Sequence, residues 1–290
     1  MTLSNGNVLS SVTVSGAMRR QVVRCGPEES IARCIARMIK YKTGAVLVEE
    51  ESGVCLGVVS KTDVVGMYYA GLGLDTRMGD IAGNEPVCCH PGDRLETALA
   101  TMLERGVRRV YVRTQGLITG VVGYADIVGA MYRICQQCRR NVYTSGKLRP
   151  EATGWLTAAD VMHRGVTGCS ASAPLSLALE TLLESGIGAV AVFDDSGQYP
   201  VGVLSLSDAV LAYRHEEDTG TMVGRIMSAP VLACRQVDLL TSALRTMIYA
   251  DVQRIFVYSP ALDRLIGVIS LTDAARARSG ACKACRVARL

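Results

Sequence analysis

The chain has 290 residues, of which 49% are hydrophobic and 20% charged, and its formal net charge is +4. This composition allows a buried core and excludes a disordered chain, and so mild a charge does not by itself indicate a nucleic-acid-binding protein. No apolar run approaches the roughly 18 residues that a membrane-spanning helix needs, and the first residues do not resemble a signal peptide. We therefore expect a cytoplasmic protein of about two domains.

A short motif ending in an aspartate recurs four times along the chain. The copies are GVVSKTDVV (57–65), GVVGYADIV (120–128), GVLSLSDAV (202–210) and GVISLTDAA (267–275). Their aspartates are Asp63, Asp126, Asp208 and Asp273. The second and third copies are further apart than the other neighbours, and such internal repetition predicts a chain built from repeated units.

The same predicted elements surround each motif. In the first repeat, a strand near Cys25 precedes a helix over residues 31–39, two strands over 45–50 and 56–60, and a helix that contains Asp63. Apolar residues at i, i+4 and i+7 give the first helix one buried face. The equivalent helices of the later repeats are expected over residues 95–103, 175–183 and 240–248. Each repeat therefore reads strand, helix, strand, strand, helix.

One repeat of this size cannot cover both faces of its own sheet, so the repeats are expected to pair. We predict an α/β fold of four βαββα repeats arranged as two paired modules, residues 8–138 and 155–285. The stretch between them, residues 139–154, is basic, polar and interrupted by glycine and proline, as expected of a linker.

The repeated motif and the helix with its methionine resemble the CBS-domain family, small modules named after cystathionine β-synthase. The strand starts VRRVYV and VQRIFV are similar to the basic strand starts of that family. Family members with four copies include the γ subunit of AMP-activated protein kinase. The resemblance implies two paired CBS modules that form a disc and bind adenine nucleotides in clefts between paired repeats.

The resemblance also implies roles for individual residues. In the family, the aspartate accepts hydrogen bonds from the two ribose hydroxyls. Hydroxyl side chains and the N–H groups at the helix start suit the phosphate. An arginine neutralises the charge of that phosphate. The positions that match these roles are Ser60, Thr62, Asp63, Arg108, Arg109, Asp126, Ser205, Ser207, Asp208, Arg254, Ser270, Thr272 and Asp273.

The second repeat departs from this pattern, because Gly123 and Ala125 replace the hydroxyl residues. Asp126 remains able to hold a ribose there, but phosphate capture is in doubt, and we expect fewer than four occupied sites. Ser/Thr-x-x-Asp is also a helix capping box, so the motif has a purely structural interpretation that can coexist with binding. The three histidines, His90, His163 and His215, lie near no acidic cluster in the sequence and are assigned no role.

The chain has eleven cysteines, an odd number that predicts reduced thiols and not a disulfide framework. Four of them recur before the first helix of each repeat and are expected to pack as small apolar residues: Cys25, Cys89, Cys169 and Cys234. Two Cys-x-x-Cys pairs follow the second and fourth aspartates at the same offsets. These thiols, Cys135, Cys138, Cys282 and Cys285, suit a four-cysteine zinc site that joins the modules; a free or redox dithiol in each pair is the alternative.

We therefore expect a non-catalytic regulatory protein that senses AMP, ADP, ATP or another adenosyl ligand and acts as a homodimer or on a regulated partner protein. Two other functions stay open. Basic residues around the cysteine pairs favour a zinc-knuckle nucleic-acid-binding protein, and basic neighbours that favour thiolates suit a thiol redox protein.

Overall fold

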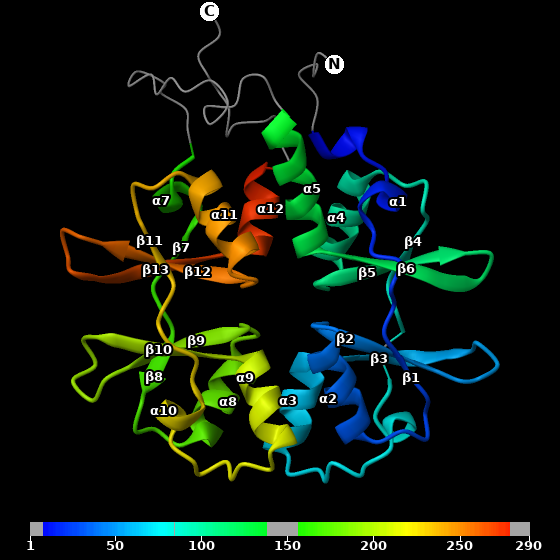
Figure 1. Cartoon of the computed structure of the whole chain (residues 1–290), viewed down its shortest axis with the longest axis horizontal. Coiled ribbons are helices and arrows are strands. Elements are labelled where there is room, and N and C mark those ends of the chain that lie inside the picture. Colours follow the sequence, from blue (N-terminus) through cyan, green and yellow to red (C-terminus); the bar gives the residue numbers. More distant parts are fainter. Residues whose placement is uncertain (1–7, 84, 138–155, 279–290) are drawn as a thin grey trace, which may run out of the picture. The chain divides into compact units, whose positions relative to one another are not determined.

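The computed structural model describes residues 8–83, 85–137 and 156–278. Within these residues the four repeats each form a small mixed sheet with helices packed on it, as the sequence predicts (Figure 1). In repeat 1 these elements are β1 (Arg24–Cys25), α2 (Ile31–Lys40), β2 (Ala45–Glu49), β3 (Cys55–Ser60) and α3 (Lys61–Tyr69).

The other three repeats follow the same order of elements. Repeat 2 contains β4 (Cys88–Cys89), α4 (Leu95–Glu104), β5 (Arg109–Thr114), β6 (Leu117–Gly123) and α5 (Tyr124–Gln137). Repeat 3 contains β8 (Gly168–Ser170), α8 (Leu175–Glu184), β9 (Ala189–Phe193), β10 (Pro200–Ser205) and α9 (Leu206–Arg214). Repeat 4 contains β11 (Ala233–Arg235), α11 (Leu240–Tyr249), β12 (Arg254–Ser259), β13 (Arg264–Ser270) and α12 (Leu271–Arg278).

The sheets share one three-stranded topology, and in repeat 4 the short strand β7 (His163–Arg164) pairs antiparallel with β13 as a fourth strand. In each, the short first strand runs parallel to the second, and the second pairs antiparallel with the third. The second strand lies in the centre and is apolar on both faces, as in β2, where Ala45 to Val48 are all buried. The third strand leads directly into the aspartate helix, so the pairing of the two strands fixes where that helix begins.

The described residues divide into two compact units, each made of alternate repeats. Repeats 2 and 4 share one unit, and repeats 1 and 3 share the other. Each unit has its own hydrophobic core. The first helix of every repeat supplies that core with its i, i+4 and i+7 residues, which are Ile31, Ile35 and Met38, Leu95, Leu99 and Met102, Leu175, Leu179 and Leu182, and Leu240, Leu244 and Met247. The periodicity that predicted one buried face per helix is confirmed.

Helices from both repeats meet inside each unit. In the unit of repeats 2 and 4, α5 lies beside α12 (Figure 1). In the unit of repeats 1 and 3, α3 packs on α9, where the Tyr68 and Tyr213 rings stack with centroids 4.7 Å apart and planes 10° apart. Tyr213 donates a hydrogen bond to the Leu72 carbonyl at 2.6 Å, and Tyr68 donates one to the Glu217 carbonyl. This reciprocal exchange links the two repeats.

A short segment precedes each repeat and packs on a different repeat; we call these segments arms. The arms are residues 13–19, 77–83, 157–163 and 222–228, and each holds one short helix: α1 (Val14–Ala17), η2 (Met78–Asp80), α7 (Ala158–Val161) or α10 (Val223–Ile226). β-bridges place arm 1 on repeat 2, arm 2 on repeat 1, arm 3 on repeat 4 and arm 4 on repeat 3. The exchange is therefore reciprocal within each consecutive pair of repeats, which the sequence did not predict.

The division of the chain into residues 8–138 and 155–285 as paired modules stays a prediction, and the linker at 139–154 lies outside the described residues. In the described part of the chain, no helix is both long enough and apolar enough to cross a membrane.

Candidate ligand-binding sites at the aspartate helix starts

All four motif aspartates begin a helix in the same geometry. In each, the Oδ2 atom accepts a hydrogen bond from the backbone N–H three residues earlier, at 2.7 to 2.8 Å. Complete capping boxes join Ser60 to Asp63 and Ser205 to Asp208, and Ser270 makes the same contacts with Asp273. The capping interpretation is thus confirmed, and the backbone cap uses only the Oδ2 atom of each carboxylate.

In each unit, the hydroxyl residue two positions after one capping serine contacts the first residue of the aspartate helix of the other repeat. Lys61, the first residue of α3, donates a hydrogen bond from Nζ to Ser207 Oγ at 2.7 Å. At the equivalent place in the other unit, Tyr124 is hydrogen-bonded to Thr272. Thr62 occupies the matching second position of α3. Two predicted phosphate-facing hydroxyls therefore lie beside a polar residue of the neighbouring helix, and Lys61 is a cation that the sequence analysis missed.

The arms supply the remaining partners of the aspartates. Arg19 of arm 1 forms an ion pair with Asp126, with Nε 3.0 Å from Oδ1 and 3.2 Å from Oδ2. Ser228 of arm 4 donates to Asp208 Oδ1 at 2.6 Å. His163 of arm 3 lies with Nε2 2.8 Å from Asp273 Oδ1.

The expectation that His163 lies near no acid was therefore wrong, because the fold brings it to a carboxylate 110 positions away in the chain. The sequence does hold a signal, since Met18, Met162 and Met227 each precede the contacting arm residue.

The glycine of the motif lets the arm approach the third strand. A Cβ at Gly120 would lie 2.7 Å from Met18 Sδ and 3.1 Å from the Arg19 carbonyl oxygen. At Gly202 and Gly267, a Cβ would likewise collide with the methionine and the carbonyl oxygen of the packed arm. The residue after each glycine then pairs with the arm, as Val121 does with Arg19. Glycine at this place therefore positions the arm residue over the aspartate.

The arginines predicted to face a phosphate gather in the unit of repeats 2 and 4. Desolvation, together with the nearby charge of Arg108, lowers the pKa of Arg254 to about 10, although the charge of Asp273 opposes the shift. Desolvation also lowers the pKa of Arg109 and Arg108. Burial raises the pKa of Asp126 even though Arg19 and Arg109 oppose the shift. Arg109 and Arg254 are half-buried and Arg108 is exposed. All three guanidiniums stay charged at neutral pH, so they can attract an anion.

The cysteines that recur before each first helix pack as expected. Burial raises the pKa of Cys89 and of Cys234 to about 11 and also raises that of Cys169, so these thiols stay protonated at neutral pH. This protonation disfavours a thiol redox role at these three positions.

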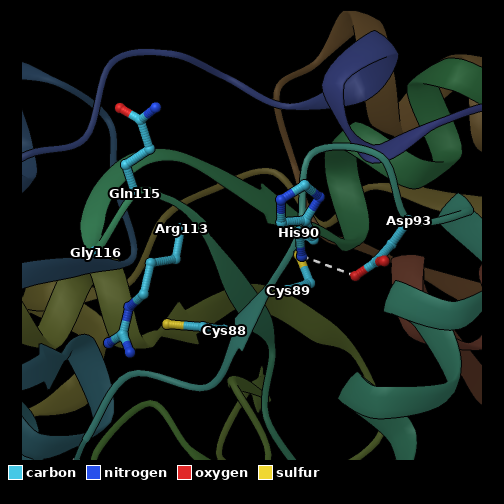
Figure 2. Close-up of a pocket in the computed structure, with 7 residues that line it drawn as sticks. All are labelled: Cys88, Cys89, His90, Asp93, Arg113, Gln115 and Gly116. Carbon is cyan, nitrogen blue, oxygen red and sulfur yellow. Dashed lines mark hydrogen bonds between the residues drawn. The ribbon is translucent and has the colours of Figure 1, made fainter.

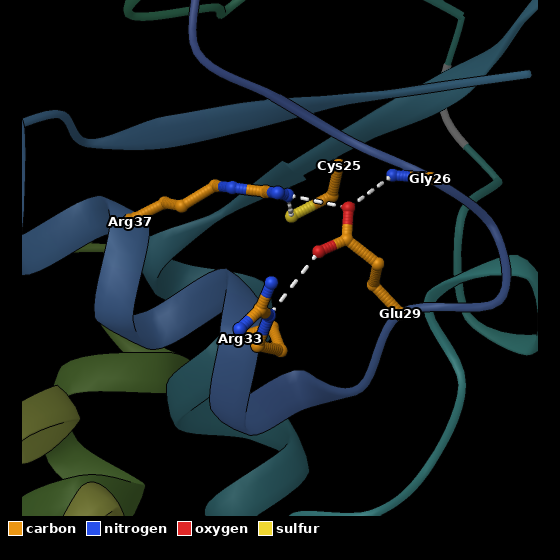
Figure 3. A network of polar contacts seen from close by, with 5 residues as sticks. All are labelled: Cys25, Gly26, Glu29, Arg33 and Arg37. Carbon is orange, nitrogen blue, oxygen red and sulfur yellow. Dashed lines mark hydrogen bonds and ion pairs between the residues drawn. The ribbon is translucent and has the colours of Figure 1, made fainter. Parts of the chain in front are cut away.

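Cys25 differs from these cysteines (Figure 3). The hydrogen bond with Cys34 lowers its pKa against the effect of burial, and Arg37, which donates to Cys25 Sγ at 2.8 Å, lowers it further.

The same arginine connects Cys25 to Glu29. Arg37 Nη1 donates to Glu29 Oε1 at 2.6 Å, and the Gly26 N–H donates to the same oxygen at 2.8 Å. Desolvation raises the pKa of Glu29, but these two hydrogen bonds, the charge of Arg37 and a hydrogen bond from Arg33 together leave the pKa below its ordinary value. The network fastens the loop before α2 to that helix, which has no side-chain cap at Ser30.

The proposed four-cysteine site lies outside the described residues at Cys138, Cys282 and Cys285, and the side chain of Cys135 is not described either. No group of three or more metal-ligating side chains occurs within residues 8–83, 85–137 and 156–278. The zinc site therefore stays a prediction from the sequence.

An open depression of about 490 Å³ lies in repeat 2 (Figure 2). Its lining residues are Cys88, Cys89, His90, Asp93, Arg113, Gln115 and Gly116. Asp93 accepts a hydrogen bond from the His90 N–H at 2.7 Å and so holds one wall in shape. None of the predicted nucleotide-binding residues lines this depression, so it is separate from the aspartate helix starts.

Comparison with known proteins agrees with the repeat architecture. The family model of the CBS domain matches residues 13–69, 78–133, 158–215 and 223–280, so the matched segments begin within or next to the arms. The protein MJ1225 of Methanocaldococcus jannaschii is 20% identical over 195 residues, which are 66% of this chain and 67% of that protein. The CBS domain-containing protein YhcV of Bacillus subtilis is 27% identical over 117 residues, 40% of this chain and 82% of that protein.

Two solved structures share the fold over most of the chain. The crystal structure of MJ1225, a suggested archaeal homologue of γ-AMPK, superimposes with a TM-score of 0.76 at 15% identity and covers 92% of this chain and 99% of that one. An uncharacterized conserved protein from Pyrococcus horikoshii superimposes with a TM-score of 0.59 at 19% identity, with the same coverage.

Proposed function

Because the chain belongs to the CBS-domain family, with four copies over most of its length, we propose that it is a non-catalytic regulatory protein that binds adenine nucleotides. The proposal places the ribose on a motif aspartate and the phosphates near cationic side chains. It includes a cytoplasmic location and action as a homodimer or on a partner protein.

One observation carries this proposal: the same carboxylate is held in the same way at four helix starts. Each Oδ2 is fixed by a backbone N–H, so the second oxygen has a defined direction. A ribose diol presents two adjacent O–H donors, and an ionised carboxylate is an acceptor without donors of its own. Capping alone needs only one carboxylate oxygen and does not explain why the motif aspartates of repeats 2, 3 and 4 also lie beside a glycine and a packed arm.

Charge supports binding of the phosphate part of the ligand. Arg108, Arg109 and Arg254 are partly desolvated in one unit, and Lys61 lies at a helix start in the other. A phosphate oxygen accepts strong charge-assisted hydrogen bonds from such groups, and the N–H groups at a helix start add to the attraction. The suggested relation of MJ1225 to γ-AMPK is consistent with a nucleotide ligand of this kind.

The test compares two aspartates that cap helices in the same way. Asp63→Asn keeps an amide oxygen for the Ser60 N–H but replaces the second acceptor with a donor. Asp160→Asn is the matched control, because Asp160 accepts from the Thr157 N–H at 2.8 Å in a capping box outside the motif.

We expect Asp63→Asn to weaken AMP, ADP or ATP binding at that site about ten- to hundredfold, since two hydrogen bonds to a charged acceptor are lost. The control is expected to bind as the wild type does. Isothermal titration calorimetry on nucleotide-free protein measures both, and equal affinity of the two variants would contradict the proposal.

A further inference from the structure

In three of the arms, one position lies over the motif aspartate of the repeat on which the arm packs. Counted from the residue that forms the first β-bridge of the arm, which is Thr13, Thr157 or Met222, this position is Arg19, His163 and Ser228. The same count from Arg77 gives Gly83 in arm 2. Three of these residues pair with the strand before the aspartate helix: Arg19 with Val121, His163 with Val268 and Ser228 with Val203. In these three arms the backbone therefore fixes the position, and only the side chain differs.

The four side chains hold the aspartates to different degrees. Arg19 contacts both oxygens of Asp126, so no carboxylate oxygen there lacks a partner. His163 and Ser228 each contact the Oδ1 atom alone. Gly83 has no side chain, and within the described residues no hydrogen bond reaches the Oδ1 atom of Asp63. Among the described residues, the four aspartates thus range from fully partnered at Asp126 to a free Oδ1 atom at Asp63.

We propose that this arm residue decides which motif aspartates can receive a ribose diol. The inference rests on the proposed nucleotide-binding function and adds a rule for which sites fill. Asp63 accepts a diol at Oδ1 without loss of a contact to any described residue, Asp208 and Asp273 must exchange one hydrogen bond, and Asp126 must give up an ion pair. The arm residue is therefore a positioning residue that competes with the ligand for the carboxylate.

Physical considerations set the size of this competition. Asp126 is only 11% exposed, whereas Arg19 is 47% exposed, so the pair has a partly dehydrated acid and a solvated base. Ion pairs of this kind contribute up to about 1 kcal/mol. A ligand that displaces Arg19 from Asp126 therefore binds roughly fivefold more weakly than it does when the acid is open.

Exchange of the two extreme residues tests the rule in both directions. Arg19→Gly gives arm 1 the residue that arm 2 has at the same count, and it leaves in place the two backbone hydrogen bonds between residues 19 and 121, each 3.0 Å long. Gly83→Arg gives repeat 1 the residue found over Asp126, and a Cβ at Gly83 would meet no described heavy atom within 4 Å. Both variants are therefore expected to fold, which circular dichroism and thermal unfolding check.

Matched controls distinguish the contact between the guanidinium and the aspartate from the effect of net charge and from the effect of an added side chain. Arg20→Gly removes the same charge at the next residue, which is also exposed. Gly83→Ala adds a side chain without a cation. Native mass spectrometry with AMP counts the nucleotides bound to each variant, and calorimetry gives the affinities.

We expect Arg19→Gly to gain about fivefold in affinity at one site or to bind one more AMP, and we expect this gain to vanish when Asp126→Asn is added. Gly83→Arg is expected to bind AMP about fivefold more weakly at one site, while both controls bind as the wild type does. A wild type that binds AMP but is unchanged by both exchanges would overturn the inference alone. A wild type that binds no adenine nucleotide would overturn the proposed function, and the inference with it.

Discussion

The stacked tyrosine pair between repeats 1 and 3 offers a direct measure of what holds alternate repeats together. Tyr213 is 5% exposed and Tyr68 6% exposed, and each donates its hydroxyl to a backbone carbonyl of the opposite repeat. Tyr213→Phe keeps the ring and the stack but leaves the Leu72 carbonyl without this donor. A buried acceptor that loses its partner costs about 1 to 2 kcal/mol, and we expect the free energy of unfolding to fall by that amount.

Removal of the whole ring has a larger expected effect. Tyr213→Ala loses the hydroxyl, the buried ring and the stack with Tyr68, and large-to-small core changes of this kind cost about 3 to 5 kcal/mol, with roughly 1 kcal/mol more for the aromatic pair. Urea unfolding followed by circular dichroism measures both variants. Because the chain has two units with separate cores, the loss is expected in the transition of the unit that contains repeats 1 and 3.

Tyr249→Phe is the matched control, because Tyr249 is 78% exposed and lies in the other unit. Surface changes of this type alter stability by less than about 0.5 kcal/mol. If Tyr213→Phe cost no more than this control, the reciprocal hydrogen bonds would not stabilise the packing of repeats 1 and 3, and the reasoning would be refuted.

Three further predictions concern the loop network, the motif glycine and the thiols. Hydrogen bonds hold the pKa of Glu29 below its ordinary value. The stabilisation of the fold by ionised Glu29 is therefore complete above the pKa of the unfolded state and is lost as the pH falls through the pKa of the folded state. Glu29→Gln should lower the free energy of unfolding by about 1 kcal/mol at pH 7, and urea titrations should show that the stability of this variant falls less steeply in acid. Gly267→Ala should destabilise the fold by about 1 to 3 kcal/mol, because the added Cβ would collide with arm 3. Gly129→Ala is the control, because a Cβ at this position in α5 meets open space, and it should be neutral or stabilising. Thermal unfolding compares the two variants. Replacement of Cys282 and Cys285 with serine should abolish bound zinc in elemental analysis, and unchanged zinc content would reject the four-cysteine site.

Much of the fold follows from local sequence patterns. The i, i+4 and i+7 spacing of Ile31, Ile35 and Met38 marks the buried face of α2, and the same spacing marks the other three first helices. The start of each aspartate helix is equally local, because the capping residue and the aspartate are only three positions apart. These features depend on short-range geometry that a single sequence displays.

The partners of the aspartates could not be predicted in the same way. Arg19 reaches Asp126 across 107 positions and His163 reaches Asp273 across 110, because the arms pack on a repeat other than the one that they precede. No periodicity within a repeat carries that information. A methionine recurs directly before the arm residue in three arms, but this is a weak signal in the sequence. It indicates arm packing only once the structure shows that the methionine contacts the glycine of the third strand.

The most direct measurement of the central claim is calorimetric titration of AMP into nucleotide-free protein, for the wild type and for a variant with all four motif aspartates changed to asparagine. The amide oxygens keep the helix caps, so the variant is expected to fold. The account predicts binding of fewer than four AMP molecules to the wild type and loss of that binding in the variant. Equal binding by a folded variant would contradict the assignment of the aspartates as the ribose-binding residues.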